Sequence, residues 1–494
     1  MRAILWGAAL TSLLLGSEVH AGGADVGGYF RVAARPDLQG GNGRLGYWNL
    51  YGRLMNEGSY GMLELRYDIL EPQPQSFAEW ASLHVRIEGG SIANADGSNG
   101  TLEAFRMSQV FVKSGNVLIP GVTWQLGTLE YFYGDLGLYD VRPATVFFDT
   151  VGLSGRYESE RAEILIGLGD SGFRRYGWNY NAVPTAGGVF RLKPVPGHLE
   201  FGLGGEYKLE CSIAGNVNAH YQTPGLNYED WVRGEVAESY VQEFGPELAD
   251  YFPDPEARNA TGWKGVGYLG FGGAGPLVWN NFFASVERML PEKSVTETFA
   301  GEEFTYWVHD FTDERTVVNL GNEMQLRLVP NRLDAVWASW IGSATDGDND
   351  IVPSDWDRSW ASTVLRLQAY PSETVHVLLE TSLAREFSRN GRAYREHADS
   401  IFANTEGRPD TRGLEYGDSD TRNTWQAKGG VVLNPLGRGI YSRPSLRALY
   451  GVQHSNQNNA FGNSFVETLD QYNDFEAVEQ HWHHMLSLEA EVWF

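Results

Sequence analysis

The last nine residues of the chain alternate strictly between two kinds of side chain, and this pattern constrains the fold more than any other feature. One row is Leu486, Leu488, Ala490, Val492 and Phe494, and the other is Ser487, Glu489, Glu491 and Trp493. Successive side chains of a β-strand point to opposite faces, so the segment predicts a strand with one apolar face and one charged face. In a soluble sandwich a large aromatic ring belongs on the apolar face, whereas Trp493 shares its row with two glutamates. We therefore predict a strand of a membrane barrel, with lipid outside and a polar lumen inside.

The same alternation recurs along the chain. In residues 29–35, Tyr29 and Arg31 share one row. Residues 49–54, a turn at 56–59 and residues 62–68 predict a hairpin with Leu50 and Leu54 on the outside. Further strands are expected at residues 83–88, 110–113, 163–168, 198–203, 324–328 and 375–380, and long external loops at 72–81, 217–262, 343–360 and 381–422.

The two ends of the chain indicate an exported protein. Residues 1–21 combine a basic start at Arg2, an apolar run and a small residue at Ala21, which predicts a cleaved signal peptide. No linker divides residues 22–494, so we expect one all-β transmembrane antiparallel barrel domain in the outer membrane of a Gram-negative cell, surrounded by its lipid. At about 25 residues per strand and loop, that length predicts about 18 strands, although 16 are not excluded by the arithmetic.

Composition limits the partners. The formal net charge of −25 argues against binding nucleic acid, which requires a basic face. Acidic external loops explain this charge, and a mild preference for cations is the functional alternative. The single cysteine, Cys211, cannot form a disulfide within the chain.

We find no pattern that predicts an enzyme or a resident cofactor, because no Ser/His pair or carboxylate pair is brought together by the sequence. Asp346, Asp348 and Asp350 alternate in the way that Ca²⁺ ligands do, but the terminal glutamate of a calcium loop is missing, and a plain acidic loop is the alternative. The histidines at 481, 483 and 484 surround Trp482, which favours an aromatic belt at the membrane surface over a metal site.

The parity of the predicted strands places a set of aromatic and cationic residues in the lumen. The aromatics are Tyr29, Tyr51, Tyr441 and Trp493, and the cations include Arg31, Arg53, Arg443 and Arg447. Sugars stack their C–H faces on aromatic rings and hydrogen-bond at their edges to charged groups, so this combination favours a sugar-conducting channel. Two alternatives stay open: the rings form a belt that faces lipid, or the chain is a general, weakly cation-preferring porin.

Several segments resemble the maltoporins, the family of sugar-specific outer-membrane porins. They are Gly28-Tyr29-Phe30-Arg31, Arg53-Leu54-Met55-Asn56-Glu57 with Glu64-Leu65, Ala104-Phe105-Arg106, the run Ile440 to Arg447 around Ser442-Arg443-Pro444, and the terminal Glu491-Val492-Trp493-Phe494. The similarity covers both ends of the chain, while residues 170–420 align only loosely. It implies an 18-stranded barrel, a homotrimer, and facilitated diffusion of maltose and maltodextrins along an aromatic slide with polar tracks.

The resemblance also implies roles for particular residues. Tyr29, Tyr441 and Trp493 match slide positions; Arg31, Arg53, Glu64 and Arg106 match polar-track positions; Asp135 and Asp140 match acidic residues near an inward-folded constriction loop within 134–149. Four positions depart from the family pattern. Tyr441 stands where a tryptophan is familiar, and Met62 where a slide tyrosine is expected, so Tyr51 or Tyr60 would replace it. Tyr133 stands for an arginine, and a slide phenylalanine is lost near Gly265, where Trp263 would replace it. Trp80 is the candidate for a ring lent by a neighbouring subunit.

Overall fold

The computed structural model describes residues 22–34, 38, 49–71, 77–89, 106–172, 182–210, 260–289, 295–299, 302–306, 316–345, 358–388, 421–456 and 481–494. The strands of the wall are β1 (Ala24–Ala34), β2 (Tyr60–Leu70), β3 (Trp80–Gly89), β4 (Arg106–Gly115), β5 (Val122–Thr128), β8 (Val151–Glu158), β9 (Ala162–Asp170), β10 (Pro184–Val195), β11 (Leu199–Glu210), β12 (Ala260–Ala274), β13 (Leu277–Arg288), β16 (Thr316–Val329), β17 (Leu333–Thr345), β18 (Arg358–Ala369), β19 (Val375–Ser388), β20 (Thr421–Leu433), β21 (Ser445–Ser455) and β22 (Trp482–Trp493). The short elements are η1 (Asn49–Tyr51), β6 (Tyr131–Phe132), β7 (Thr145–Val146), β14 (Val295–Phe299) and β15 (Glu302–Tyr306).

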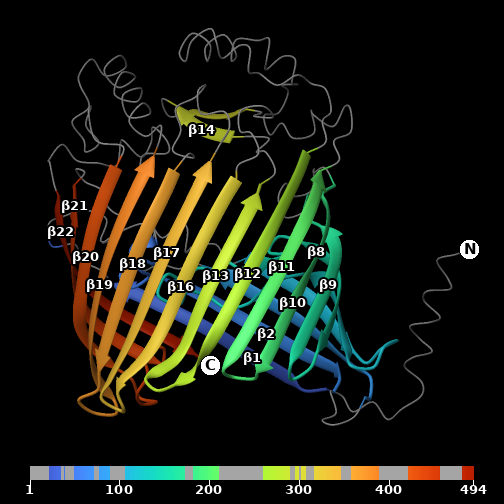
Figure 1. Cartoon of the computed structure of the whole chain (residues 1–494), viewed down its shortest axis with the longest axis horizontal. Coiled ribbons are helices and arrows are strands. Elements are labelled where there is room, and N and C mark those ends of the chain that lie inside the picture. The colour runs from blue at the N-terminus through green and yellow to red at the C-terminus, as the bar shows by residue number, and fades with distance from the viewer. Residues whose placement is uncertain are drawn as a thin grey trace, which may run out of the picture.

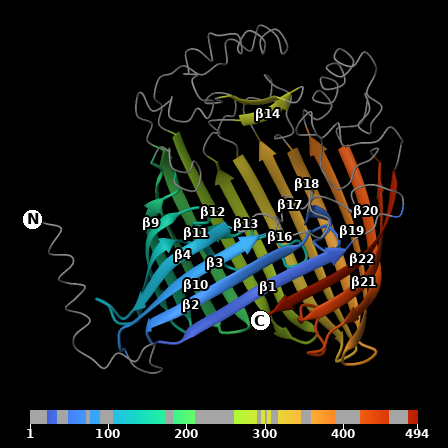
Figure 2. The same ribbon diagram turned by 180° about the vertical axis from the view of Figure 1, so that it is seen from behind.

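The wall is a closed antiparallel barrel. Its described strands form a single 18-stranded sheet in which each strand pairs with its neighbours in the chain (Figure 1). Closure comes from β1, which pairs with β2 on one side and with β22 on the other (Figure 2). Tyr29 therefore lies opposite Trp493. A closed ladder leaves no strand edge unpaired, which is the condition for a sheet that crosses a membrane. The predicted barrel and strand number are confirmed.

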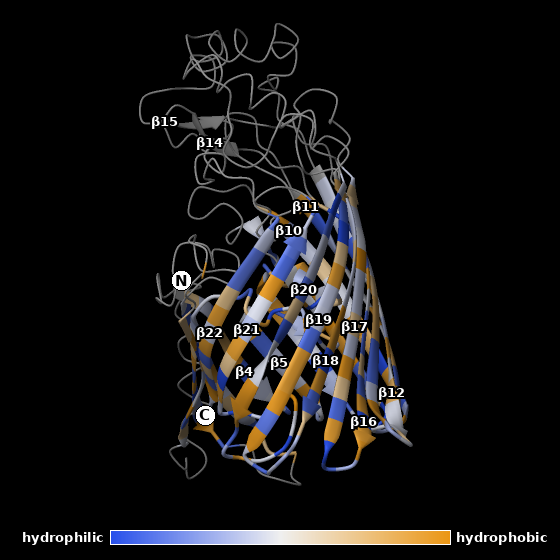
Figure 3. Cartoon of the chain, turned by 90° about the vertical axis from the view of Figure 1, so that its left-hand side faces the viewer, coloured by the Kyte–Doolittle hydropathy of each residue, from blue (hydrophilic) through white to orange (hydrophobic). Residues whose placement is uncertain are grey.

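Side chains alternate between the two faces of this wall as the sequence predicted. Outward rows are apolar and exposed: in β9, Ile164, Ile166 and Leu168 are 43%, 64% and 63% exposed. Inward rows are polar and mostly buried, as with Glu489 and Glu491 in β22. Apolar and hydrophilic bands therefore alternate along each strand in Figure 3. An apolar exterior of this kind is suited to lipid and not to water.

The connections divide into two ends. At the short-turn end lie compact turns such as residues 275–276 between β12 and β13 and residues 330–332 between β16 and β17. The connections at the other end, the long-loop end, are mostly longer, as between β11 and β12 and between β19 and β20. The predicted external loop at 72–81 was wrong in position, because β2 ends and β3 begins at the short-turn end. Residues 343–345 and 381–388, also assigned to loops, belong to β17 and β19.

Two connections from the long-loop end fold into the lumen. The first is the 49–59 segment, between β1 and β2, which includes η1. The second is the 129–150 loop, between β5 and β8, which includes β6 and β7. Their apolar side chains form the core of the molecule inside the barrel, where Leu50, Leu136 and Leu138 are fully buried. The predicted constriction loop within 134–149 is thus confirmed as an inward-folded segment.

The predicted strand at 49–54 was wrong. Leu50 and Leu54 do not face lipid but are 0% and 3% exposed inside the barrel, where η1 packs against β18 and β19. Leu54 joins a small apolar cluster with Leu378, Val432, Leu449 and Met485, which stand on the inward rows of β19 to β22. Gly52 has a φ of +86°, a conformation that favours glycine, and turns the chain back toward the wall. Leu50 and Leu54 therefore pack against apolar side chains inside the barrel, although their spacing would also fit a strand that faces lipid.

Among the described residues no helix has the length and apolar character needed to cross a membrane.

Candidate functional site: the lumen

The 129–150 loop is held against a wall of glycines. Tyr133 packs on Gly202 and Gly204, Phe147 on Gly167 and Gly187, and Leu136 on Gly321. A Cβ at Gly202 would lie only 2.2 Å from Cε1 of Tyr133. Because no side chain stands in these positions, the ring of Tyr133 reaches the backbone, and its hydroxyl donates to the carbonyl of Leu203 at 2.5 Å. The inward rows of β9 to β11 are therefore shaped to receive the loop.

Beyond the glycine wall the loop crosses to the opposite strands. The N–H of Leu138 donates to Oε2 of Glu323 in β16 at 2.9 Å, and the hydroxyl of Tyr139 lies 3.1 Å from that of Ser362 in β18. The ring of Tyr139 also meets Trp340 of β17 edge to face, with centroids 5.8 Å apart. The loop thus spans the lumen and divides it.

Arg53 joins the two inward segments to the wall. Its N–H donates to the carbonyl of Leu138 at 2.7 Å, and its Nη2 lies 3.0 Å from both the hydroxyl of Tyr29 and Oε1 of Glu491. Its Nη1 is 3.7 Å from Asp140 of the loop. We call Arg53, Glu57, Asp140 and Glu491 the Arg53 cluster. Arg443 and Arg447 also pair with Glu491, and Arg31 pairs with Glu57.

The two loop carboxyls of the Arg53 cluster have opposite charge preferences. Burial raises the pKa of Glu57 to about 7, although Arg31 and Arg53 act against this rise. Burial also disfavours the ionised form of Asp140, but the nearby Arg53 outweighs it, with help from Glu57 and Arg31, and lowers the pKa of Asp140 below its usual value. At neutral pH the cluster therefore keeps Asp140 charged and holds Glu57 near its titration point.

A second set of buried charges fixes the other side of the 49–59 segment. Glu380 of β19 accepts from Nε of Arg366 at 2.7 Å and from Nζ of Lys428 at 3.0 Å, and Lys428 also donates to the carbonyl of Tyr51. The hydroxyl of Tyr51 donates to Glu386. These groups are at most 3% exposed, so the segment closes this side of the lumen to water.

The exposed polar side chains of the lumen lie on the opposite side, along β2 to β8. The side chains of Glu64, Arg66, Arg142 and Arg156 are 46%, 38%, 43% and 38% exposed. Nε of Arg86 in β3 donates to Glu64 at 2.6 Å, and its Nη1 is 3.9 Å from Glu130 at the base of the loop. Water therefore has access to a strip of paired charges between the loop and the wall of β2 to β8.

An aromatic row runs beside the Arg53 cluster. The ring of Tyr29 lies 5.9 Å from that of Tyr60 and 4.6 Å from that of Trp493, measured between centroids. Trp493 is 55% exposed at the short-turn end, whereas Tyr29 is 6% exposed and bonds Glu491 at 2.7 Å. The Trp493 ring thus faces the lumen and packs against the ring of Tyr29, which is itself held by its hydrogen bond to Glu491. We call Tyr60, Tyr29 and Trp493 the aromatic row.

The remaining predicted site residues are scattered. Tyr441 lies in the turn after β20 and not in a strand, and donates to Glu323 at 2.7 Å. Tyr51 is buried against β19 and β20, so Tyr60 and not Tyr51 neighbours Tyr29. Asp135 is exposed on the loop, and Arg106 begins β4, its side chain lying outside the described part.

Two suggested substitutions for family positions are not supported by the geometry. Trp263 stands on an outward row of β12, 41% exposed, so it cannot contribute to a lumen slide. The ring that occupies this part of the lumen is Tyr268, which stacks on Tyr133 at 5.4 Å. Trp80 stands on an inward row of its own barrel, opposite Gly115.

One suggested metal site, formed by Asp346, Asp348 and Asp350, lies outside the described residues. The same is true of Cys211 and of the predicted signal peptide, residues 1–21. Within the described part of the chain no group of three or more His, Cys, Asp or Glu side chains could hold a metal ion. The three histidines near the start of β22 diverge: His483 points inward, and Nδ1 of His484 lies 2.6 Å from the hydroxyl of Tyr450 on the outside.

Comparisons with known proteins find only distant similarities, all to solved structures. No family model and no curated protein matches the chain, so the maltoporin resemblance gains no support and stays a prediction. Similar solved structures include the outer membrane channel DcaP of Acinetobacter baumannii, with 8% identity, a TM-score of 0.45 and coverage of 97% of this chain and 99% of that one. OprD of Pseudomonas aeruginosa has 10% identity, a TM-score of 0.40 and coverage of 97% and 98%. OmpT of Vibrio cholerae, an outer membrane protein, has 9% identity, a TM-score of 0.37 and coverage of 96% and 100%.

Proposed function

We propose that this chain is an outer-membrane channel for the facilitated diffusion of oligosaccharides of the maltodextrin class, without covalent chemistry. The observation that carries the proposal is the aromatic row beside the Arg53 cluster. It offers flat apolar rings next to hydrogen-bonding charges within one lumen. A sugar can stack on Trp493 while its hydroxyls replace their hydrogen bonds to water by hydrogen bonds to the side chains of Arg53 and Asp140.

The division of the lumen supports the same proposal. The inward segments close the side of β18 to β20, and the exposed charges of Glu64, Arg86 and Arg142 bound the open strip. Weak binding at several successive places lets a solute both enter and leave, which conduction requires. The exported form that begins near residue 22 and a homotrimeric assembly belong to this proposal.

The test is single-channel current in a planar bilayer with titrated maltodextrins. We expect discrete, concentration-dependent blocks of the ion current by the native protein. Trp493→Ala should weaken sugar binding by about tenfold, since stacking on one ring contributes about 1 kcal/mol or more. Trp263→Ala is the matched control, because Trp263 is similarly exposed but stands on the outward row.

A general, weakly cation-preferring porin is the second candidate, favoured by the net charge of −25. It predicts no block by any maltodextrin, equal entry of all solutes of one size in liposome swelling, and no effect of Trp493→Ala. That set of results would replace the sugar channel by the general porin.

A further inference from the structure

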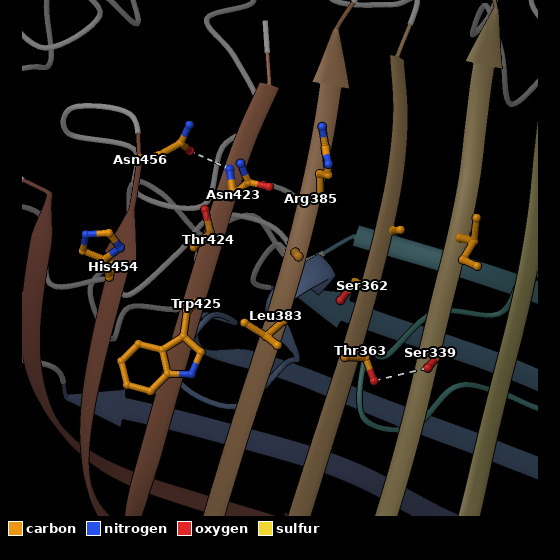
Figure 4. Close-up of a pocket in the computed structure, with 13 residues that line it drawn as sticks. Ser339, Ser362, Thr363, Leu383, Arg385, Asn423, Thr424, Trp425, His454 and Asn456 are labelled. Carbon is orange, nitrogen blue, oxygen red and sulfur yellow. Dashed lines mark hydrogen bonds between the residues drawn. The ribbon is translucent and has the colours of Figure 1, made fainter. Parts of the chain in front are cut away.

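A groove lies on the outside of the barrel wall. It has a volume of about 520 Å³ and crosses β17 to β21. Figure 4 shows its polar residues, Arg385, Asn423 and Asn456, nearer the long-loop end, with Leu383 and Trp425 below them. The residues whose side chains form its floor and sides stand on the outward rows, as the exposure of Leu383 at 56% confirms.

A second groove of about 410 Å³ lies beside the first and crosses β16 to β19. The two grooves share Ile341, Ala361 and Arg385. Two apolar grooves therefore lie on either side of the Arg385 guanidinium. Small residues make the depressions, since Ala361 and Ser339 stand between larger neighbours such as Ile341.

Arg385 is unusual for this surface. It is the single charged side chain on the outward rows of β16 to β22, and its guanidinium makes no hydrogen bond or ion pair with another described residue. A charge on the lipid face is destabilising at the membrane centre and is tolerated near the membrane surface. Arg385 lies near the end of β19, beside an aromatic belt. In this belt the ring centroid of Trp482 is 4.5 Å from that of His454 and 6.3 Å from that of Trp425.

The indole of Trp425 is fixed along the wall by its own contacts. Its Nε1 donates to the hydroxyl of Thr381 at 3.1 Å, and Nε1 of Trp337 donates in the same way to Thr363 at 2.7 Å. The polar atoms of both rings are thus satisfied within the barrel, and the face of the Trp425 ring remains as an apolar side of the first groove. The wall offers hydrocarbon contact with one unmatched positive charge above it.

We propose that the two grooves and Arg385 form a docking site for a phosphate-bearing lipid of the leaflet at the long-loop end. Its phosphate pairs with Arg385, and Asn423 and Asn456 lie beside it; its acyl chains lie in the two grooves. Charge complementarity carries the choice of occupant, because a lipid phosphate supplies the anion that Arg385 lacks.

A second copy of the chain is the competing occupant. Among the described strands the outward rows hold one carboxylate, Asp170, and its Oδ1 already accepts from the N–H groups of Gly172 and Val183. Packing a described wall against the grooves would therefore bury Arg385 without a free carboxylate, which is costly. The lipid is the better match to the charge.

The experiment measures lipid retention by the purified full chain in detergent, using native mass spectrometry with added lipid A. The native protein should hold lipid A at least tenfold more tightly than the same acylated disaccharide without phosphate. Arg385→Gln should lose that preference, because the loss of one charge-assisted contact changes affinity by about tenfold. Arg288→Gln, which removes an outward arginine of β13, is the control and should retain it.

Three results would overturn the proposal. One is equal retention of lipid A by Arg385→Gln and the native chain. Another is equal retention of the phosphorylated and dephosphorylated lipids by the native chain. The third is a native oligomer that Arg385→Gln dissociates, which would assign the grooves to a second copy. Sugar block of the native channel is measured separately, so the proposed transport function and the lipid site can fail independently.

Discussion

The contact between Tyr133 and Gly202 allows a sharp test of how the 129–150 loop is held. We consider Gly202→Ala, which adds one methyl group to an inward row of β11. The new Cβ would lie 2.2 Å from Cε1 of Tyr133, whereas ordinary contacts begin near 3.4 Å. The ring must therefore retreat by about 1.2 Å, the difference between these two distances. Tyr133 is 3% exposed, so little free space exists for the retreat.

The expected loss of stability follows from two effects. Overpacking a tight site costs about 1–3 kcal/mol. Separating the hydroxyl of Tyr133 from the carbonyl of Leu203 leaves a buried polar group unpaired, at about 1–3 kcal/mol. Replacing a strand glycine by alanine restricts the unfolded chain and returns about 0.4–1 kcal/mol. We expect Gly202→Ala to destabilise the barrel by about 1–6 kcal/mol, or to release the loop from its wall.

Gly265→Ala is the matched control, because its Cβ would meet no heavy atom within 4 Å and its backbone φ is ordinary. It should be neutral or more stable by up to about 1 kcal/mol. Stability is measured by denaturant unfolding in thin lipid vesicles, followed by tryptophan fluorescence, and loop release by single-channel conductance. If Gly202→Ala matches Gly265→Ala in both stability and conductance, the glycine wall does not hold the loop.

Three further predictions concern charges of the lumen. Glu380→Gln removes the carboxylate shared by Arg366 and Lys428 and should lower the unfolding free energy by about 3–5 kcal/mol, whereas Glu373→Gln, at an exposed pair with Arg438, should change it by less than about 1 kcal/mol; equal denaturant midpoints would contradict this. Arg53→Met should raise conductance and current noise by freeing Asp140 from its partner, while Arg327→Met, at a 58% exposed side chain, should leave both unchanged. Glu57 is neutral below its raised pKa of about 7 and charged above it, so cation preference, read from reversal potentials, should increase as pH rises through about 7 and should lose this step in Glu57→Gln.

The wall of this barrel was accessible from sequence because a lipid exterior leaves a strict period of two. The terminal strand, the β1 strand and the segments in β3, β9 and β16 were all located in this way. The method failed at 49–54, where Leu50 and Leu54 have the spacing of a membrane strand. Spacing reports that side chains avoid water, and both lipid and a packed lumen satisfy that condition.

The site residues that lie in strands could be predicted from alternation, and those in the inward-folded segments could not. Parity placed Tyr29 and Trp493 on the inward rows of two strands, and the structure brings their rings into contact. Parity cannot place residues of an inward-folded segment, so Tyr51 was assigned to a strand face and Tyr60 was left as its alternative. Arg53 and Glu491 are 438 positions apart in the chain, and no local pattern reveals their contact.

A signal for the inward segments was nevertheless present in the strands that receive them. Inward rows that face water should carry charges, and the rows of β2 to β4 do so. The inward rows of β19 to β22 are interrupted by Leu378, Val432, Leu449 and Met485, and these are the residues that Leu54 covers. The inward rows of β9 and β11 carry Gly167 and Gly202, which the rings of Phe147 and Tyr133 cover. A glycine on an inward row therefore predicts that an aromatic ring of an inward-folded segment packs there. An apolar side chain on an inward row predicts that a leucine of such a segment covers it. The charged inward rows of β2 to β4 then mark the part of the lumen left to water, where the proposed solute would pass.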